Sequence, residues 1–349
     1  MERSIRDTFE IPETAPIVDA DLAVPPNDEL AEYLPDRYER KGVAYPDGNW
    51  PSPFDATTPT DPHQQITDYL DRLDIDAAIV SGGGPNMRAS VQPDTRYAAE
   101  LVSAYNDWLL EHWISTDDRL RGSISVTMLE PSAAAAEIRR LGDRTDMVQV
   151  IAGGATRVGL GDQRYWPVYE AAAEMALPIA FRAGTEGYGV AHPNTGAGYP
   201  NSAIERHAVA PANFMGQLLN LVLEGPFIEY PQLRVSIVGA GYGWVPSFLW
   251  RVDKMWKGLT DDYPWVEELP SEYLRRHVRI VTWPLNEGPN TDRTTQLLDM
   301  LNAEETLMFG SGYPRVDGYD PDTGLPELPE RYADSVFSAT PASFYGINR

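Results

Sequence analysis

The sequence predicts an α/β fold, a single (β/α)8 barrel of the TIM type, and three observations lead to this prediction. Eight short apolar segments recur along the 349 residues, with helical stretches between them. Strands that alternate with helices form parallel βαβ units, and eight units over this length favour a barrel over a doubly wound sheet. Several segments run into glycine-rich loops, and in a barrel such loops line the mouth where active sites lie.

Each expected strand is a short run of mostly apolar residues between polar or turn-forming ones. The first, 15–22, has the sequence APIVDADL, and the second, 76–80, has DAAIV before the run Ser-Gly-Gly-Gly. The other expected strands are 122–126, 147–151, 178–181, 233–238, 278–282 and 306–309.

The expected helices carry apolar residues three and four positions apart, which places these residues on one face. Pro131 opens one of them, at a position where its missing N–H costs nothing. The expected helices are 64–73, 95–113, 131–141, 165–175, 212–223, 245–255 and 291–301, with partly helical structure after about residue 330.

The remaining segments define the domain organisation. Residues 1–15 are polar and predict an N-terminal arm, and residues 16–349 predict one barrel domain. Residues 26–62, rich in Pro, Asp, Gly and Tyr, predict a long excursion after the first strand. Proline and glycine are spread through the chain, so the composition indicates ordered loops and no separate linker.

Composition and charge narrow the possible functions. The absence of cysteine excludes disulfides and thiolate metal sites. The chain has 28 Lys and Arg against 52 Asp and Glu, a net charge of −24, which disfavours nucleic acids and anionic membranes as partners. Only three basic residues are lysines, and this acidic, lysine-poor composition is typical of a halophile's cytoplasmic protein, although an ordinary acidic protein is the alternative. The sequence shows neither a signal peptide's apolar region nor a membrane-spanning run, which indicates a cytoplasmic location.

Segments that follow one another along residues 16–347 carry a resemblance to a known family. They are 17–24, 105–113, 136–144, 164–181, 230–256, 271–285, 307–314 and 343–347. Together they resemble the amidohydrolase-related (amidohydrolase 2) family, which includes aminocarboxymuconate-semialdehyde decarboxylase. The resemblance implies a (β/α)8 barrel of the metal-dependent hydrolase type. It also implies hydrolysis or decarboxylation assisted by a divalent metal at the strand ends, which lowers the pKa of a bound water.

The sequence departs from the ligand pattern that the resemblance implies. Asp21 remains at the first strand, with Asp19 beside it, but the other implied ligand positions hold Ala23, Arg182, Gly239 and Gly312. A catalytic zinc site needs about three protein ligands, and a permanent guanidinium beside a divalent cation is unfavourable. We therefore expect that the metal site is lost and that the chain has no cofactor, with zinc or manganese as the alternative.

The resemblance also implies that two arginines lie at the mouth of the barrel. Arg182 and Arg315 in a pocket poor in water would bind a carboxylate or phosphate, with Asp19 beside them. The alternative for each arginine is a buried salt bridge to Asp21 or Asp19. If chemistry survives, the candidate catalytic residues are Asp21, His192 and His207, with Glu186 and Glu205 as weaker acid or base candidates.

Three functional hypotheses follow. The first is a metal-free pseudoenzyme that binds a small anionic ligand or serves as an assembly subunit. The second is an active hydrolase or decarboxylase with a rebuilt site. The third is a structural partner of an active paralogue, because family members often form dimers, and we expect a homo-oligomer. The stretch Trp244 to Trp256 is expected to pack on the barrel wall or on a partner subunit.

Overall fold

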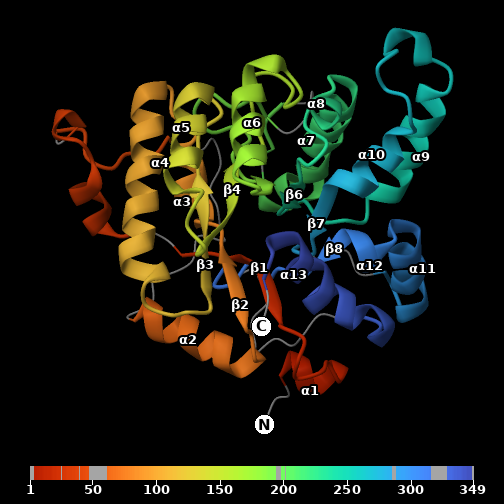
Figure 1. Ribbon diagram of the computed structural model, residues 1–349, viewed down its shortest axis with the longest axis horizontal. Coiled ribbons are helices and arrows are strands. Elements are labelled where there is room, and N and C mark those ends of the chain that lie inside the picture. The colour runs from red at the N-terminus through yellow and green to blue at the C-terminus, as the bar shows by residue number, and fades with distance from the viewer. Residues whose placement is uncertain are drawn as a thin grey trace.

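The fold is seen in a computed structural model that describes residues 4–24, 26–38, 40–46, 61–193, 198–200, 202–284, 288–315 and 328–347. Eight parallel strands follow one another in the order β1 to β8. The backbone N–H of Ala20 in the first strand donates to the carbonyl of Phe309, just after the last, at 2.8 Å. This bond brings the first and last strands together, and the sheet forms a barrel with helices around it (Figure 1).

All eight predicted strands are confirmed. They are β1 Val18–Leu22, β2 Ala77–Val80, β3 Leu120–Ser125, β4 Met147–Gly153, β5 Ile179–Arg182, β6 Val235–Val238, β7 Val278–Val281 and β8 Leu307–Met308. Nearly every strand residue is buried, as expected for a parallel sheet that is covered on both faces and therefore rich in Val, Ile and Ala.

The α-helices of the described chain are α1 Ile5–Phe9, α2 Pro62–Leu73, α3 Gly83–Ala89, α4 Thr95–Leu109, α5 Pro131–Leu141, α6 Trp166–Glu174, α7 Ala203–Leu223, α8 Pro226–Glu229, α9 Val245–Trp256, α10 Pro270–His277, α11 Thr291–Leu301, α12 Ala303–Thr306 and α13 Thr340–Tyr345. Short 3-10 turns lie at Asp28–Tyr33, Asp36–Tyr38, Gln163–Tyr165, Thr260–Asp262 and Glu330–Tyr332, and π-helical turns at Leu110–Ile114 and Ser335–Ala339. Asp61, Asp94 and Asn290 accept a hydrogen bond from a first-turn N–H of the helix that each precedes, which fixes where those helices begin.

The structure differs from the predicted helices in one boundary and in several additional short helices. Helix α7 begins at Ala203 rather than at 212, because Ser202 caps it by accepting from the Glu205 N–H. Pro211 lies inside this helix, and proline usually ends a helical pattern in sequence. Helices α1, α3, α8, α10 and α12 were not predicted. Helix α3 opens on glycines, α10 is strongly charged, and the other three are five residues long or shorter.

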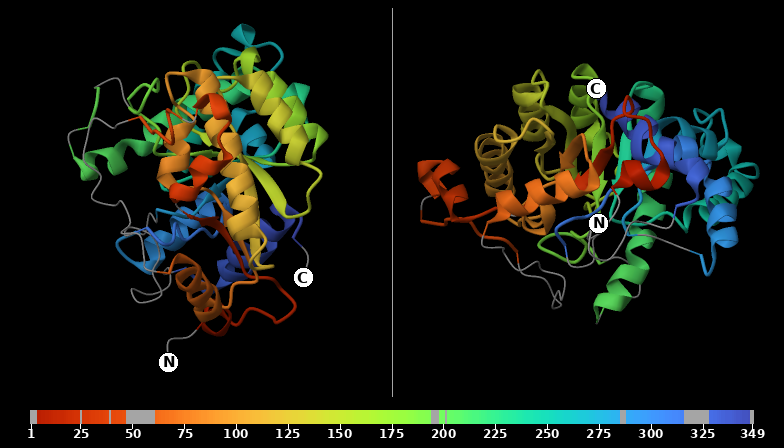
Figure 2. Two further views of the ribbon diagram at one scale, coloured as in Figure 1. Left: turned by 90° about the vertical axis from the view of Figure 1, so that its left-hand side faces the viewer. Right: turned by 90° about the horizontal axis from the view of Figure 1, so that it is seen from below.

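The amino-terminal end of the barrel is closed by both ends of the chain. Helix α1 packs its Ile5, which is fully buried, against the fold, and in both views of Figure 2 it lies beside the C-terminal segment. The rings of Phe9 and Phe337 are 5.1 Å apart. Phe344 and Tyr345 of α13 join the cluster of residues that fills the barrel interior. The opposite, carboxyl-terminal end is therefore the one available for chemistry.

No helix in the described part of the chain is both long and apolar enough to cross a bilayer.

Candidate functional site

An arginine and an aspartate meet at the carboxyl ends of the strands. Arg182, the last residue of β5, donates through Nη1 to Oδ1 of Asp21 on β1, and both side chains are almost fully buried. Ser81, directly after β2, donates its hydroxyl to the same Asp21 oxygen at 2.5 Å and accepts from Arg182 Nη1 at 2.8 Å. The salt bridge considered from the sequence is thus present, and together with Ser81 it links the ends of three strands.

Two polar atoms of this cluster have no hydrogen-bond partner among the described residues. They are Oδ2 of Asp21 and Nη2 of Arg182, and both are buried. Buried polar atoms in native proteins are nearly always bonded. One of these atoms is an acceptor and the other a donor, so the cluster retains capacity to bind a polar group.

Asp19, by contrast, is engaged on both of its oxygens. Its Oδ1 accepts from the N–H groups of Asp21 and Ser311, both at 3.0 Å. Its Oδ2 accepts from the hydroxyls of Tyr69 at 2.8 Å and Ser311 at 2.6 Å. Burial raises the pKa of Asp19, and the hydrogen bonds from Ser311, the Asp21 N–H and Tyr69 oppose that rise. The role that these bonds indicate is to hold β1 against the end of β8.

Trp283, after β7, lies over the ends of the neighbouring strands. Its ring centroid is 5.7 Å from the guanidinium carbon of Arg182 and 4.5 Å from that of Arg315. A Cβ on Gly312 would lie 2.9 Å from this ring and one on Gly239 3.0 Å from it, and both glycines have a left-handed φ, of 68° and 81°. The indole thus takes the space into which side chains at these two positions would extend.

Sequence reasoning missed Trp283. The only signal was an aromatic residue before a proline at the end of an expected strand, and such a residue is more often part of the core. Its contact with Arg182 and Arg315 depends on three segments that are far apart in the chain.

The predicted histidines and glutamates lie elsewhere at this end of the barrel. His192 is exposed after β5, His207 is half-buried on α7, and Glu205 is exposed in the first turn of that helix. Glu186 is buried and accepts from the Gly184 N–H at 2.8 Å and the Asn213 amide at 3.1 Å. Among the described residues, none of these four bonds to Asp21, so the structure does not bring the predicted catalytic set together.

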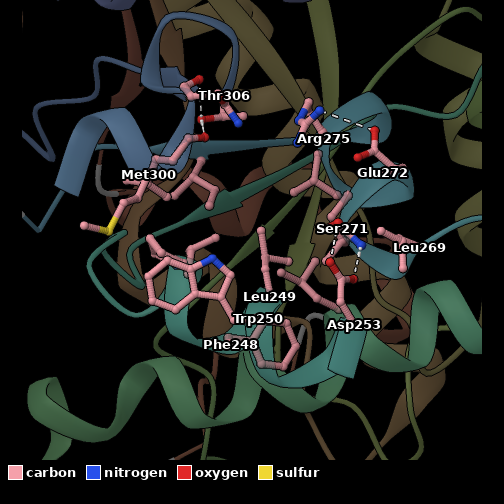
Figure 3. A pocket seen from close by; sticks show the side chains of 18 residues that line it. Phe248, Leu249, Trp250, Asp253, Leu269, Ser271, Glu272, Arg275, Met300 and Thr306 are labelled. Carbon is pink, nitrogen blue, oxygen red and sulfur yellow. Dashed lines mark hydrogen bonds and ion pairs between the residues drawn. The ribbon is translucent and has the colours of Figure 1, made fainter. Parts of the chain in front are cut away.

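A separate apolar crevice lies between α9, α10 and α11 (Figure 3). Its volume is about 310 Å³, and Trp250 and Met300 at its edge are 61% and 49% exposed. The acidic side chains that line it bond to neighbouring residues; Asp253, for example, accepts hydrogen bonds from both the N–H and the hydroxyl of Ser271. The crevice lies outside the barrel and offers packing surface rather than reactive groups.

The side chains at the mouth do not fit a divalent metal. Asp21 is the acidic residue that the resemblance implies as a ligand, and Arg182 already bonds to it. Among the residues that the structure describes, no group of three or more His, Cys, Asp or Glu side chains could hold a metal ion. A stable site needs about that many ligands, so we derive no chemical step through a metal.

Comparison with known proteins identifies the family of the chain. The model of the family described as Amidohydrolase matches residues 19–347. The chain belongs to this amidohydrolase family. Gamma-resorcylate decarboxylase of Rhodococcus jostii (strain RHA1) is 26% identical over 266 residues, which cover 70% of this chain and 75% of that one. The predicted family and the predicted barrel are both confirmed.

Two solved structures of decarboxylases share the amidohydrolase fold with this chain. One is 5-carboxyvanillate decarboxylase from Novosphingobium aromaticivorans, complexed with manganese and 4-hydroxy-3-methoxy-5-nitrobenzoic acid (TM-score 0.70, 19% identity, 95% of this chain and 96% of that one). The other is dihydroxybenzoic acid decarboxylase from Polaromonas sp. JS666 with manganese and 2-nitroresorcinol (TM-score 0.66, 18% identity, 96% and 98%).

These neighbours correct one prediction. The expectation of no cofactor was drawn from ligand positions in the sequence, and it is wrong in the light of amidohydrolase-fold decarboxylases solved with bound manganese. That expectation rested on the charge of Arg182 and on the glycines that stand at implied ligand positions on two strand ends. The described side chains of this family member still provide no ligand set for such a metal, so the activity is tested with and without manganese.

Proposed function

We propose that this amidohydrolase-family protein decarboxylates a small aromatic carboxylic acid at the mouth of its barrel. The curated relatives that match 70% of the chain are named gamma-resorcylate decarboxylases. Solved neighbours hold nitrated aromatic ligands. These comparisons support the decarboxylase hypothesis better than the pseudoenzyme hypothesis, which the sequence favoured.

The buried Nη2 of Arg182 is the observation that carries the proposal. It is a charged donor, it has no partner among the described residues, and its guanidinium lies against the Trp283 ring. Guanidinium groups bind carboxylates through charge-assisted hydrogen bonds. Arg315 lies over the same indole and is partly exposed, so it provides a second cation nearer to solvent. We assign the substrate carboxylate to these two arginines.

The reaction breaks the bond between the ring carbon and the carboxylate. Carbon dioxide leaves, the bonding electron pair stays on the ring carbon, and a proton replaces the carboxylate there. One proton is consumed for each carbon dioxide released. Oδ2 of Asp21 has no hydrogen-bond partner among the described residues, so we assign to it the transfer of the proton, which water supplies, to the ring carbon.

The test measures conversion of 2,6-dihydroxybenzoate to resorcinol by liquid chromatography, with and without manganese. The wild type is expected to form resorcinol. Asp21→Asn is expected to lower the rate by roughly 100-fold or more, the scale of a lost acid–base group. Arg315→Gln is expected to raise KM more than it lowers kcat, since it removes a binding contact.

The matched control is Arg144→Gln, which removes the same charge from an exposed arginine that pairs with Asp146, just before β4 at the opposite end of the barrel. It is expected to leave the rate unchanged. If the wild type binds aromatic acids but converts none of them under either condition, the decarboxylase proposal fails and the pseudoenzyme hypothesis replaces it.

A further inference from the structure

A groove lies beside the mouth and is formed by three parts of the chain. Residues 157–159 follow β4, residues 192–193 follow β5, and helix α7 provides the third side. Its volume is about 600 Å³, which is within the usual range for small-molecule sites. The lining residues are Arg157, Val158, Gly159, His192, Pro193, Ala212, Asn213, Gly216, Gln217 and Asn220.

The lining of this groove contrasts with the rest of the protein. The chain has 52 acidic residues against 28 Lys and Arg, yet none of the ten lining residues is Asp or Glu. Glu186 accepts a hydrogen bond from Asn213, but it is 1% exposed and does not line the groove. An anion in the groove therefore meets no carboxylate among the lining residues.

Arg157 is the charged group of the groove. It is exposed, and it forms no ion pair with any residue in the described part of the chain, whereas eleven other arginines there pair with Asp or Glu. His192 lies on the same groove and can supply a second donor from its ring. One ring nitrogen, Nδ1, is 2.8 Å from the Pro193 carbonyl.

The backbone on either side of Arg157 is held by amide side chains on α7. Asn213 donates to the Gly154 carbonyl at 3.0 Å, and Gln217 accepts from the Leu160 N–H at 2.8 Å. Asn220 accepts from the Gly161 N–H at 2.6 Å. These bonds hold residues 154–161 on both sides of Arg157, so less order has to be gained when a ligand binds.

Small residues keep the groove open. Gly216 faces open space, since a Cβ there would meet no atom within 4 Å, whereas a Cβ on Gly159 would lie 2.1 Å from the Asn220 side chain. Gly159 therefore lets the loop after β4 approach α7 closely. Gly216 leaves room for a ligand of a few atoms above the helix.

We propose that this groove binds a small oxyanion, a carboxylate or a phosphate, through Arg157 and His192. The guanidinium group binds both oxyanions in the same forked geometry. The groove shares no lining residue with the Arg182–Asp21 cluster, and the proposal does not depend on the decarboxylase activity proposed above.

The test is calorimetric titration of the full chain with benzoate in one arm and inorganic phosphate in the other. The measurements use Asp21→Leu and Arg182→Met together with Arg315→Gln as the background, so that benzoate binding at the mouth does not contribute. Saturable binding of at least one anion is expected, and the arm that responds identifies the oxyanion. Arg157→Gln is expected to weaken that binding by about tenfold, and His192→Gln by less, because hydrogen bonds from a charged guanidinium are among the strongest.

Arg144→Gln again serves as the matched charge control and is expected to change the affinity by less than about twofold. Because Arg157 is exposed and makes no described ion pair, its replacement leaves the fold intact, which circular dichroism checks. Equal weakening by both arginine variants, or no saturable binding of either anion, would overturn the proposal. Loss of decarboxylation with anion binding retained contradicts only the function proposed above.

Discussion

Two buried arginines at opposite ends of the barrel differ in how fully they are bonded. At the amino-terminal end, Arg6 donates to Asp74 at 2.6 Å, to Asp76 at 2.7 Å and to the carbonyls of Pro12 and Ala15. At the carboxyl-terminal end, Arg182 forms hydrogen bonds through Nη1, whereas its other terminal nitrogen, Nη2, has no partner among the described residues. A fully bonded guanidinium stabilises a fold, whereas a partly bonded one retains capacity for a ligand, and the difference matches the division of a barrel into a stability face and an active face.

The largest loss of folding stability is expected for Arg182→Met. It leaves Asp21, which is fully buried, without its cation, and breaking a buried pair in this way costs about 3–5 kcal/mol. Denaturant unfolding followed by tryptophan fluorescence measures this loss. Carboxylate binding at the mouth is expected to be lost as well.

The double variant Asp21→Leu, Arg182→Met separates the two effects. Replacing both charges by apolar groups is often neutral for stability, so this variant is expected to regain most of the free energy of unfolding but not the binding. If Arg182→Met lowers the free energy of unfolding by less than about 1 kcal/mol, the Arg182–Asp21 pair does not stabilise the fold.

A smaller effect is expected for Arg6→Met. Its partners Asp74 and Asp76 are 47% and 21% exposed, so water solvates them when the cation is removed, and we expect a loss of about 2–3 kcal/mol, below the range for a fully buried pair. The same unfolding measurement applies. Binding at the mouth is expected to stay as in the wild type, and a change in affinity would show that the two ends are coupled.

A glycine at each end provides a matched comparison. Gly312 and Gly346 have left-handed φ angles of 68° and 70°. Alanine at either position adds backbone strain of about 1 kcal/mol, but only at Gly312 would it also meet Trp283, at 2.9 Å. We expect Gly312→Ala to destabilise by about 1–3 kcal/mol more than Gly346→Ala, the usual cost of overpacking. Equal losses in thermal unfolding would mean that the indole moves aside without cost.

The smallest effect is expected from a histidine at the amino-terminal end. Burial lowers the pKa of His277, whose ring nitrogen Nδ1 lies 2.8 Å from the Leu233 carbonyl. The unfolded chain takes up this proton near pH 6.5, and the folded protein takes it up only at lower pH. Stability therefore falls as the pH drops below about 6.5, and unfolding curves at pH 8 and pH 5.5 measure this. His277→Gln is expected to show a smaller difference between the two pH values, with binding at the mouth unaffected.

The sequence predicted the barrel well because each strand is a local signal. Runs such as DAAIV at 76–80 show their burial directly in composition, and all eight strands formed where such runs occur. The limits of α7 were harder to predict, because Pro211 lies inside the helix and the capping residue, Ser202, follows a loop rich in Gly and Asn.

The site was only partly predictable, because its contacts join distant residues. Asp21 and Arg182 were singled out individually, but their common partner Ser81 and the nearby Trp283 follow other strands. The halophilic origin, the cytoplasmic location and the homo-oligomer stay predictions. His192 was expected to be a base, and its place beside Arg157 came from the fold alone.

The contact between Asp19 and Ser311 has a consequence for how the protein is made. Two of its hydrogen bonds join residues 292 positions apart, and translation at 5–20 residues per second needs about 15–60 s to cover that distance. During this time the first strand is complete but the strand that closes the barrel beside it does not yet exist. The edge of the first strand therefore stays without its final partner, and open to other pairing, until the last segment emerges.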